Sequence, residues 1–133
     1  MDIRVSFPSG RKVEAQLGPY VVITDQSLAH GGAGTAPEPF DLFLASLATC
    51  AGFYVLSFCQ ARNIPTSEIE LVQHQRFDEQ THRLTHVDLE ILLPDGFPEA
   101  YRAAVVRAAD SCKVRKTLAA PPEIAVSAAV RAA

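Results

Sequence analysis

A twenty-residue segment from Phe40 to Cys59 is apolar almost throughout and carries a single charge, Asp41, near its start. A helix of this length could just cross a bilayer. The segment also contains Ser46 and Thr49, and amphipathic segments lie on both sides of it. A helix that is apolar all round is equally what the centre of a folded domain or dimer requires. We therefore expect a core helix and no membrane association.

The composition is that of one globular domain covering residues 1–133, with 48% hydrophobic and 20% charged residues. The net charge of −3 leaves no broad basic surface for nucleic acid. Three widely spaced cysteines do not resemble the disulfide framework of a secreted protein. The start, MDIRVSF, has neither the long apolar stretch nor the cleavage site of a signal peptide. These features together predict a cytoplasmic protein whose cysteines stay reduced unless they have redox work to do.

Hydrophobic periodicity and turn residues predict an α+β fold with antiparallel sheets. In chain order we expect three short strands within residues 3–24, a glycine-rich loop over 30–37, a long helix from Pro39 to about Asn63, strands over 68–77 and 82–93, a helix starting near Pro98, a short helix over 113–119, and a closing strand through Ile124, Val126 and Ala128. The glycine-rich loop lacks the lysine of a phosphate-binding loop, so we interpret it as a plain connection.

The cysteines are the candidate chemical groups. Cys50 and Cys59 are nine residues apart on the long helix, so they point to opposite faces about 13 Å apart along the axis and cannot form a disulfide. Either of them could meet Cys112, which lies on another helix. The small residues around Cys50 would let a second helix approach closely, which favours Cys50. Spacing alone nevertheless favours two unrelated buried thiols over a Cys50–Cys112 pair.

The surroundings predict different reactivities for the three thiols. Cys112 follows Ser111, a good N-cap residue, so we expect the first turn of the short helix to lower the pKa of Cys112. Cys50 lies about three turns inside its helix, beyond reach of the helix dipole, and would need a nearby cation or hydrogen-bond donor. Cys59, between Phe58 and Gln60, is expected to fill the core.

Three histidines in the predicted hairpin raise the question of a metal site. With a turn over residues 78–81, His74 would project from the opposite face to His82 and His86. Two histidines without a third ligand are a weak zinc site, so we expect a solvated sheet face and no metal.

Two segments resemble a known family. The stretch APEPFDLFLASLATC, residues 36–50, resembles the helix of the OsmC/Ohr family that carries its first cysteine, and ADSCKVRKTL, residues 109–118, resembles the family's second-cysteine segment. The order of predicted elements also matches the family over nearly the whole chain.

The resemblance implies an OsmC-like fold, in which antiparallel sheets wrap long central helices in an interleaved homodimer. It also implies thiol-dependent reduction of organic hydroperoxides, and of hydrogen peroxide as a further substrate, in oxidative-stress defence. By this resemblance Cys50 becomes a sulfenic acid and Cys112 resolves it to a disulfide. No cofactor is implied beyond an external thiol or dithiol reductant.

The sequence also departs from the family pattern. Peroxidase members carry a glutamate ten residues before the first cysteine, where this chain has Phe40, with Asp41 one position later. Asp41 could replace that glutamate only if the helix turned by about 100°, and it equally fits a plain helix-start acid. The family also uses an N-terminal arginine to hold the thiolate, for which Arg4 and Arg11 are the candidates, and Arg11 is our choice.

Three functions follow from these features. The first is the peroxidase, with Phe40, Phe43 and Tyr54 lining the substrate pocket. The second is a catalytically silent OsmC-like protein that binds an apolar small molecule in the dimer cleft, which the missing glutamate favours. The third is a hot-dog-fold thioesterase, which would leave the second helical segment and Cys112 unexplained.

Overall fold

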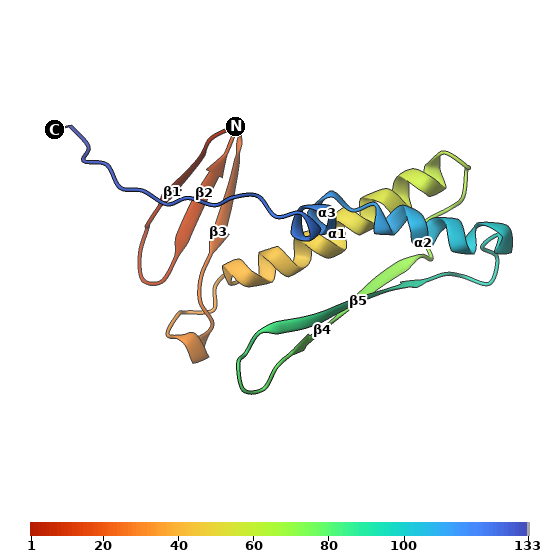
Figure 1. Ribbon diagram of the computed structural model, residues 1–133, viewed down its shortest axis with the longest axis horizontal. Coiled ribbons are helices and arrows are strands. Elements are labelled where there is room, and N and C mark those ends of the chain that lie inside the picture. Colours follow the sequence, from red (N-terminus) through yellow and green to blue (C-terminus); the bar gives the residue numbers. More distant parts are fainter. Residues whose placement is uncertain (133) are drawn as a thin grey trace. The chain divides into compact units, whose positions relative to one another are not determined.

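The computed structural model describes residues 1–132 and confirms an α+β chain with antiparallel sheets (Figure 1). Its contacts divide it into two compact units, of which the first covers Met1–Ser46 and the second begins at Leu47. The long helix belongs to both units, because the boundary falls within it.

The first unit contains a three-stranded antiparallel sheet in the order β1, β2, β3, as the alternation predicts. The strands are β1 (Ile3–Ser6), β2 (Val13–Leu17) and β3 (Tyr20–Thr24). Gly10 and Gly18 occupy the two turns at φ of 57° and 53°, a left-handed conformation that glycine adopts without a Cβ clash. All four residues of β1 are exposed, so this strand is not covered within the chain.

The loop after β3 is held by two carboxylates. It contains a short 3₁₀ helix, η1 (Leu28–His30), followed by the glycine-rich stretch. Asp25, only 1% exposed, accepts hydrogen bonds from the backbone N–H and the hydroxyl of Thr35 at 3.0 and 2.7 Å. Glu38 accepts hydrogen bonds from the backbone N–H of Ser27 at 2.9 Å and pairs with His30 Nδ1 at 2.6 Å. These bonds fix the approach of the chain to the long helix, a role that the sequence did not assign to His30.

The long helix α1 (Pro39–Gln60) confirms the principal prediction. It begins with Pro39 in its first turn, and it is followed by a turn in which Asn63 adopts φ of 54° and Ile64 N–H donates to the carbonyl of Cys59. By length and composition this helix could also cross a membrane. That match is weak support for a membrane span, because core helices of soluble proteins pass the same test.

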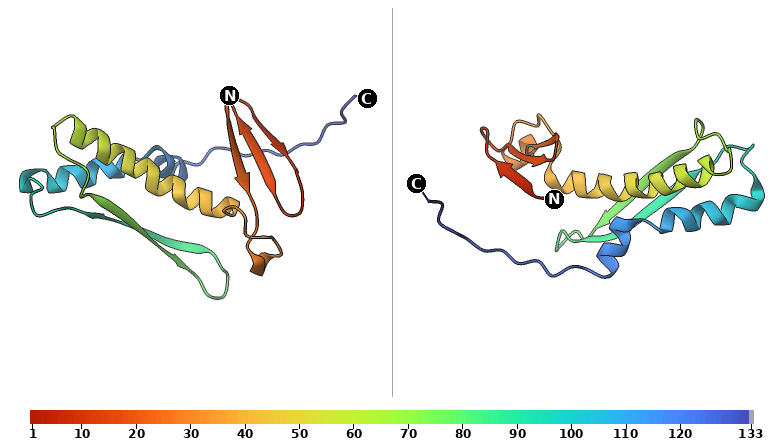
Figure 2. Two further views of the ribbon diagram at one scale, coloured as in Figure 1. Left: turned by 180° about the vertical axis from the view of Figure 1, so that it is seen from behind. Right: turned by 90° about the horizontal axis from the view of Figure 1, so that it is seen from above.

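In the second unit, α1 packs with a β-hairpin and two further helices (Figure 2). The hairpin consists of β4 (Glu70–Phe77) and β5 (Leu84–Leu92), paired antiparallel. A 3₁₀ turn, η2 (Glu99–Tyr101), leads into α2 (Arg102–Asp110), and α3 (Lys113–Ala119) follows. The core consists of Ala51, Val55, Cys59, Phe97, Val105, Ala109 and Cys112.

The expected closing strand is wrong for the single chain. Residues 120–132 form no strand, and Ile124, Val126 and Val130 are 83–99% exposed (Figure 1). Alternating apolar residues favour extended backbone, but a strand also needs the edge of a sheet to bind. Among the described residues this segment pairs with no strand.

Candidate thiol site

Cys50 and Cys112 lie next to one another within the second unit, so of the two cysteines on α1 it is Cys50 that interacts with Cys112. Cys50 lies on α1 and is partly buried, whereas Cys112 is 2% exposed and belongs to the core. Both thiols are free. The side chain of Cys112 is close enough to Cys50 to lower the pKa of Cys50 by hydrogen bonding.

The turn between α2 and α3 places Cys112. Ser111 ends α2, and Cys112 has φ of −50° and ψ of 124°, so it forms the N-cap of α3. Its Sγ accepts a hydrogen bond from the backbone N–H of Arg115 at 3.4 Å. Its thiol also donates to the carbonyl of Leu47 at 3.9 Å. Leu47 lies one turn before Cys50 on the same side of α1, so this contact holds Cys112 at the level of Cys50.

The pKa of Cys50 is lowered, and the start of α3 is the principal cause. The largest contribution is a hydrogen bond from the backbone N–H of Val114, followed by the side chain of Cys112. The backbone N–H and the charge of Lys113 lower the pKa further, while burial opposes them. The donor that Cys50 was expected to need is therefore supplied by another helix. Its reactive form, the thiolate, is favoured.

The pKa of Cys112 is raised, so the prediction that the short helix would lower it is wrong. Burial is the largest cause and outweighs the hydrogen bond from Arg115 N–H. The neighbouring Cys50 also raises the pKa of Cys112. Cys112, not Ser111, occupies the N-cap position, so its sulfur is folded back against the helix and into the core. The pKa of Cys50 is thus lower than that of Cys112, as expected when Cys50 is the attacking thiol and Cys112 the resolving thiol.

Cys59 behaves as predicted. It is fully buried, and burial raises the pKa of its thiol. A buried, protonated thiol is a poor nucleophile.

Asp41, Phe40 and Arg11 belong to the first unit, and their predicted roles toward the thiols stay predictions. Asp41 Oδ2 accepts a hydrogen bond from the backbone N–H of Glu38 at 3.0 Å, which is the geometry of a helix-start acid. Phe40 is 46% exposed, and its ring centre lies 5.3 Å from that of Phe43. Tyr54, the third predicted lining residue, is on α1 within the second unit and makes an edge contact with Phe53.

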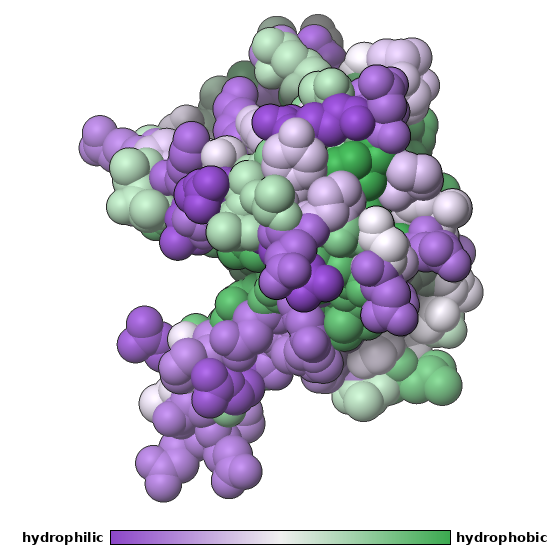
Figure 3. Space-filling model, turned by 90° about the vertical axis from the view of Figure 1, so that its right-hand side faces the viewer, coloured by the Kyte–Doolittle hydropathy of each residue, from purple (hydrophilic) through white to green (hydrophobic). Residues whose placement is uncertain are grey.

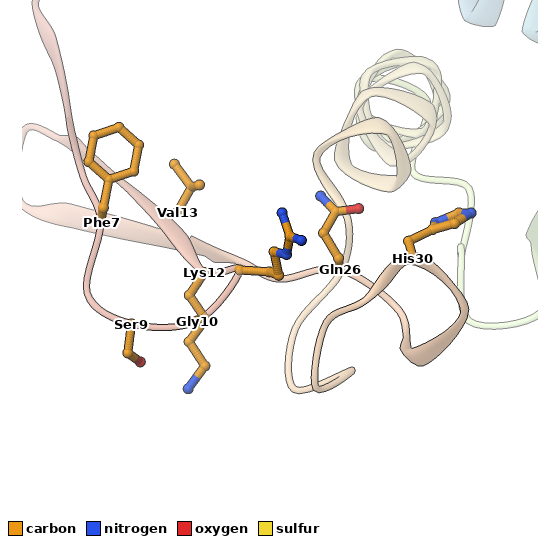
Figure 4. A pocket seen from close by; sticks show the side chains of 8 residues that line it. Phe7, Ser9, Gly10, Lys12, Val13, Gln26 and His30 are labelled. Carbon is orange, nitrogen blue, oxygen red and sulfur yellow. The ribbon is translucent and has the colours of Figure 1, made fainter.

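Arg11 lies in the turn between β1 and β2 and lines a hollow of about 480 Å³. Lys12, Gln26 and His30 line the same hollow (Figure 4). Its guanidinium lies over Gly31 of the glycine-rich loop. Arg11 is thus a cation at the surface of the first unit.

The hairpin register corrects the prediction for the histidines. His74 pairs with Asp88, and Arg76 pairs with His86, so His74 and His86 share a face instead of opposing one another. His82 lies in the turn at φ of 58°. Within residues 1–132 no group of three His, Cys, Asp or Glu side chains is arranged to hold a metal ion.

Sequence reasoning missed Leu47, Lys113 and Val114. Leu47 and Val114 act through backbone groups, which the side-chain sequence does not display. One sequence signal could have found Lys113 and Val114. They directly follow Cys112 at the start of the short helix, where backbone N–H groups lack partners within the helix and can donate to a nearby sulfur.

Comparison with known proteins now identifies the family. A model of OsmC-like proteins matches residues 31–127, which is most of the chain. The chain belongs to the OsmC-like protein family. No curated protein gives a significant match.

Solved structures show the same fold for this OsmC-like chain. An osmotic stress induced and detoxification response protein from Psychrobacter arcticus is 20% identical with a TM-score of 0.73, over 86% of this chain and 85% of the other. The OsmC-like protein from Mycoplasma pneumoniae is 14% identical with a TM-score of 0.70, over 90% and 87%. The organic hydroperoxide resistance protein OhrB of Bacillus subtilis is 22% identical with a TM-score of 0.53, over 88% and 90%. At these identities the likeness establishes the OsmC-like fold only. The activity must be argued from the residues of the thiol site.

Proposed function

We propose that this OsmC-like protein is a thiol-dependent peroxidase that reduces organic hydroperoxides, and hydrogen peroxide as a second substrate, in oxidative-stress defence. The observation that carries the proposal is the paired environment of Cys50 and Cys112. The pKa of Cys50 is lowered by Val114 N–H, while the pKa of its neighbour Cys112 is raised by burial. The thiolate of Cys50, which is the nucleophile, is therefore favoured, whereas Cys112 is favoured in its protonated form.

The reaction follows from these two states. The Cys50 thiolate attacks one peroxide oxygen, the O–O bond breaks, and the other oxygen leaves as the alcohol after taking a proton. Cys50 is then a sulfenic acid. The sulfur of Cys112 attacks the Cys50 sulfur, its proton and the hydroxyl depart as water, and a disulfide forms. An external thiol or dithiol restores both cysteines, so no resident cofactor is needed.

The start of α3 supplies the stabilisation that the missing glutamate would otherwise help to arrange. Val114 N–H and Lys113 act on Cys50 from within the second unit. Arg11 is proposed as an additional cation, with Asp41 in a supporting role, both brought to the thiol by assembly. Phe40, Phe43 and Tyr54 are proposed to contact the organic part of the hydroperoxide.

Assembly as a homodimer is part of the proposal, because large apolar side chains of the second unit are exposed in the single chain. Phe53 on α1 is 60% exposed and Val106 on α2 is 55% exposed. A second copy of the chain would cover such side chains. Figure 3 shows hydrophobic residues at the surface of the second unit, among hydrophilic ones.

Peroxide consumption by matched cysteine variants tests the activity. With dithiothreitol as reductant, wild type and Cys59→Ser should consume cumene hydroperoxide at similar rates, and Cys50→Ser should consume none above background. With dithiothreitol left out, Cys112→Ser treated with the same hydroperoxide should accumulate a sulfenic acid that a dimedone-type reagent labels on Cys50. Equal consumption by wild type and Cys50→Ser would refute the peroxidase. The silent binding protein, which Phe40 in place of glutamate favours, would then be tested by ligand binding to the purified dimer.

A further inference from the structure

The two sulfurs of the proposed disulfide differ in their access to solvent. Cys112 is 2% exposed and packs in the core with Val105 and Ala109, whereas Cys50 is only partly buried. An attacking thiolate approaches a disulfide along the S–S axis, so the sulfur that it reaches must be open on the side away from its partner. Access is one of the factors that decide which sulfur is attacked.

Two backbone contacts pack against the Cys112 sulfur. Arg115 N–H donates to its Sγ at 3.4 Å, and the carbonyl of Leu47 lies 3.9 Å from it. Both contacts are made by backbone atoms of packed helices, which cannot swing away as a surface side chain can. The same N–H of Arg115 is placed to stabilise negative charge on Cys112.

We propose that the external thiol which regenerates the protein attacks the sulfur of Cys50, and that Cys112 is the internal leaving group received by Arg115 N–H. The incoming thiolate forms a bond to the Cys50 sulfur while the Cys50–Cys112 bond breaks. The electron pair goes to Cys112, which then takes a proton from water. A second thiol attacks the sulfur of the bound reductant, releases the oxidised reductant and returns Cys50 as a thiolate.

If leaving-group strength alone decided, the external thiol would attack Cys112 and Cys50 would leave. A thiol of lower pKa leaves faster, and the pKa of Cys50 is the lower of the two. The burial of Cys112 decides against attack on its sulfur, because a residue that is 2% exposed offers no line of attack to an external molecule. The charge of Lys113, which acts on Cys50, also attracts an anionic thiolate toward Cys50. Arg115 adds less, because it is paired with Asp110 at 3.3 Å.

The test begins with two ways of oxidising the same protein, because the inference rests on the proposed function for how the disulfide arises. Diamide removes two electrons and two protons from a pair of thiols without any peroxide. Cumene hydroperoxide should give the same disulfide if the proposed function is correct. A disulfide from diamide but not from hydroperoxide would refute the peroxidase while leaving the direction of reduction testable.

Diamide-oxidised wild type is then exposed briefly to limiting 2-mercaptoethanol, blocked with N-ethylmaleimide at acid pH and mapped by mass spectrometry without reduction. We expect mercaptoethanol on Cys50 with N-ethylmaleimide on Cys112, in excess over the reverse pattern by about ten-fold or more. The reverse pattern, an even mixture, or no disulfide after diamide would overturn the proposal.

Single-thiol variants give an independent measurement that cannot be altered by exchange within the pair. Cys59→Ser/Cys112→Ser and Cys59→Ser/Cys50→Ser each leave one thiol of the pair. Both are treated with an aromatic disulfide, and the release of its thiol is timed. Cys50 should react at least about ten-fold faster than Cys112. Equal rates in folded variants, checked by circular dichroism, would contradict the difference in access.

Discussion

Oxidation of Cys50 and Cys112 to a disulfide should stabilise the protein strongly, because the two thiols already meet in the reduced chain. The link joins α1 to the start of α3 and closes a loop of about 60 residues. For a loop of this length, the lost entropy of the unfolded chain corresponds to about 4 kcal/mol at 25 °C. This full stabilisation requires that the native state accept the link without strain, which the existing contact between the side chains supports.

Urea unfolding of the reduced and the diamide-oxidised protein measures the effect. With a slope of about 1.5 kcal/mol per molar urea, a stabilisation of about 4 kcal/mol moves the midpoint upward by about 2 to 3 M. Both samples are compared at one protein concentration, because the proposed dimer makes the midpoint depend on concentration. Cys112→Ser treated with diamide in the same way is the control and should show no such shift.

A midpoint that stays unchanged or falls on oxidation would refute the reasoning, provided that mass spectrometry confirms the Cys50–Cys112 link in the sample. Such a result would mean that the native state must distort to form the bond. The side chains of Cys50 on α1 and Cys112 at the N-cap of α3 would then not be in contact in the reduced protein.

Three further perturbations test individual parts of the structure. Val114→Pro removes the N–H that lowers the pKa of Cys50 and should raise that pKa relative to Val114→Ala, as read from the pH dependence of alkylation by iodoacetamide; identical profiles would exclude the hydrogen bond. Asp25→Asn should destabilise the protein at neutral pH, since the pKa of Asp25 is lowered from 3.8 to about 2 and its stabilisation is present above pH 3.8 and lost as the pH falls through 2. Thermal melts of wild type and Asp25→Asn should therefore converge at low pH, and a constant difference would contradict the assignment. Gly32→Ala should lower the melting temperature, because its Cβ would overlap the carbonyl of Gln26, whereas Gly52→Ala, where a Cβ meets open space, should not.

Most of the element order could be predicted from periodicity, because each element carries its own local pattern. The long apolar run gave α1, and alternation gave the strands of both sheets. The closing strand through Ile124 could not be settled this way, since its alternation says only that the segment can be extended. Whether it pairs depends on a sheet edge, which no local pattern supplies.

The pairing of Cys50 with Cys112 was predicted in part, and the electrostatics of the pair were not. The small residues around Cys50 indicated a close approach by another helix. The raised pKa of Cys112 differed from the expectation because it depends on which residue forms the N-cap of α3, and a shift of one position moves a thiol from solvent into the core. For Cys50 the need for a donor was predicted, but its identity, the N–H of Val114, was not. Likewise, the face of His74 depended on the length of the hairpin turn, which decides the register.

The most direct test of the account is the fate of the thiols after one equivalent of an organic hydroperoxide. Peptide-mapped mass spectrometry of the reduced protein, quenched within seconds, should find Cys50 linked to Cys112 and Cys59 unmodified. A dithiol should reopen the link. Recovery of Cys50 and Cys112 as unmodified thiols would contradict the central claim that the start of α3 prepares this pair for peroxide reduction.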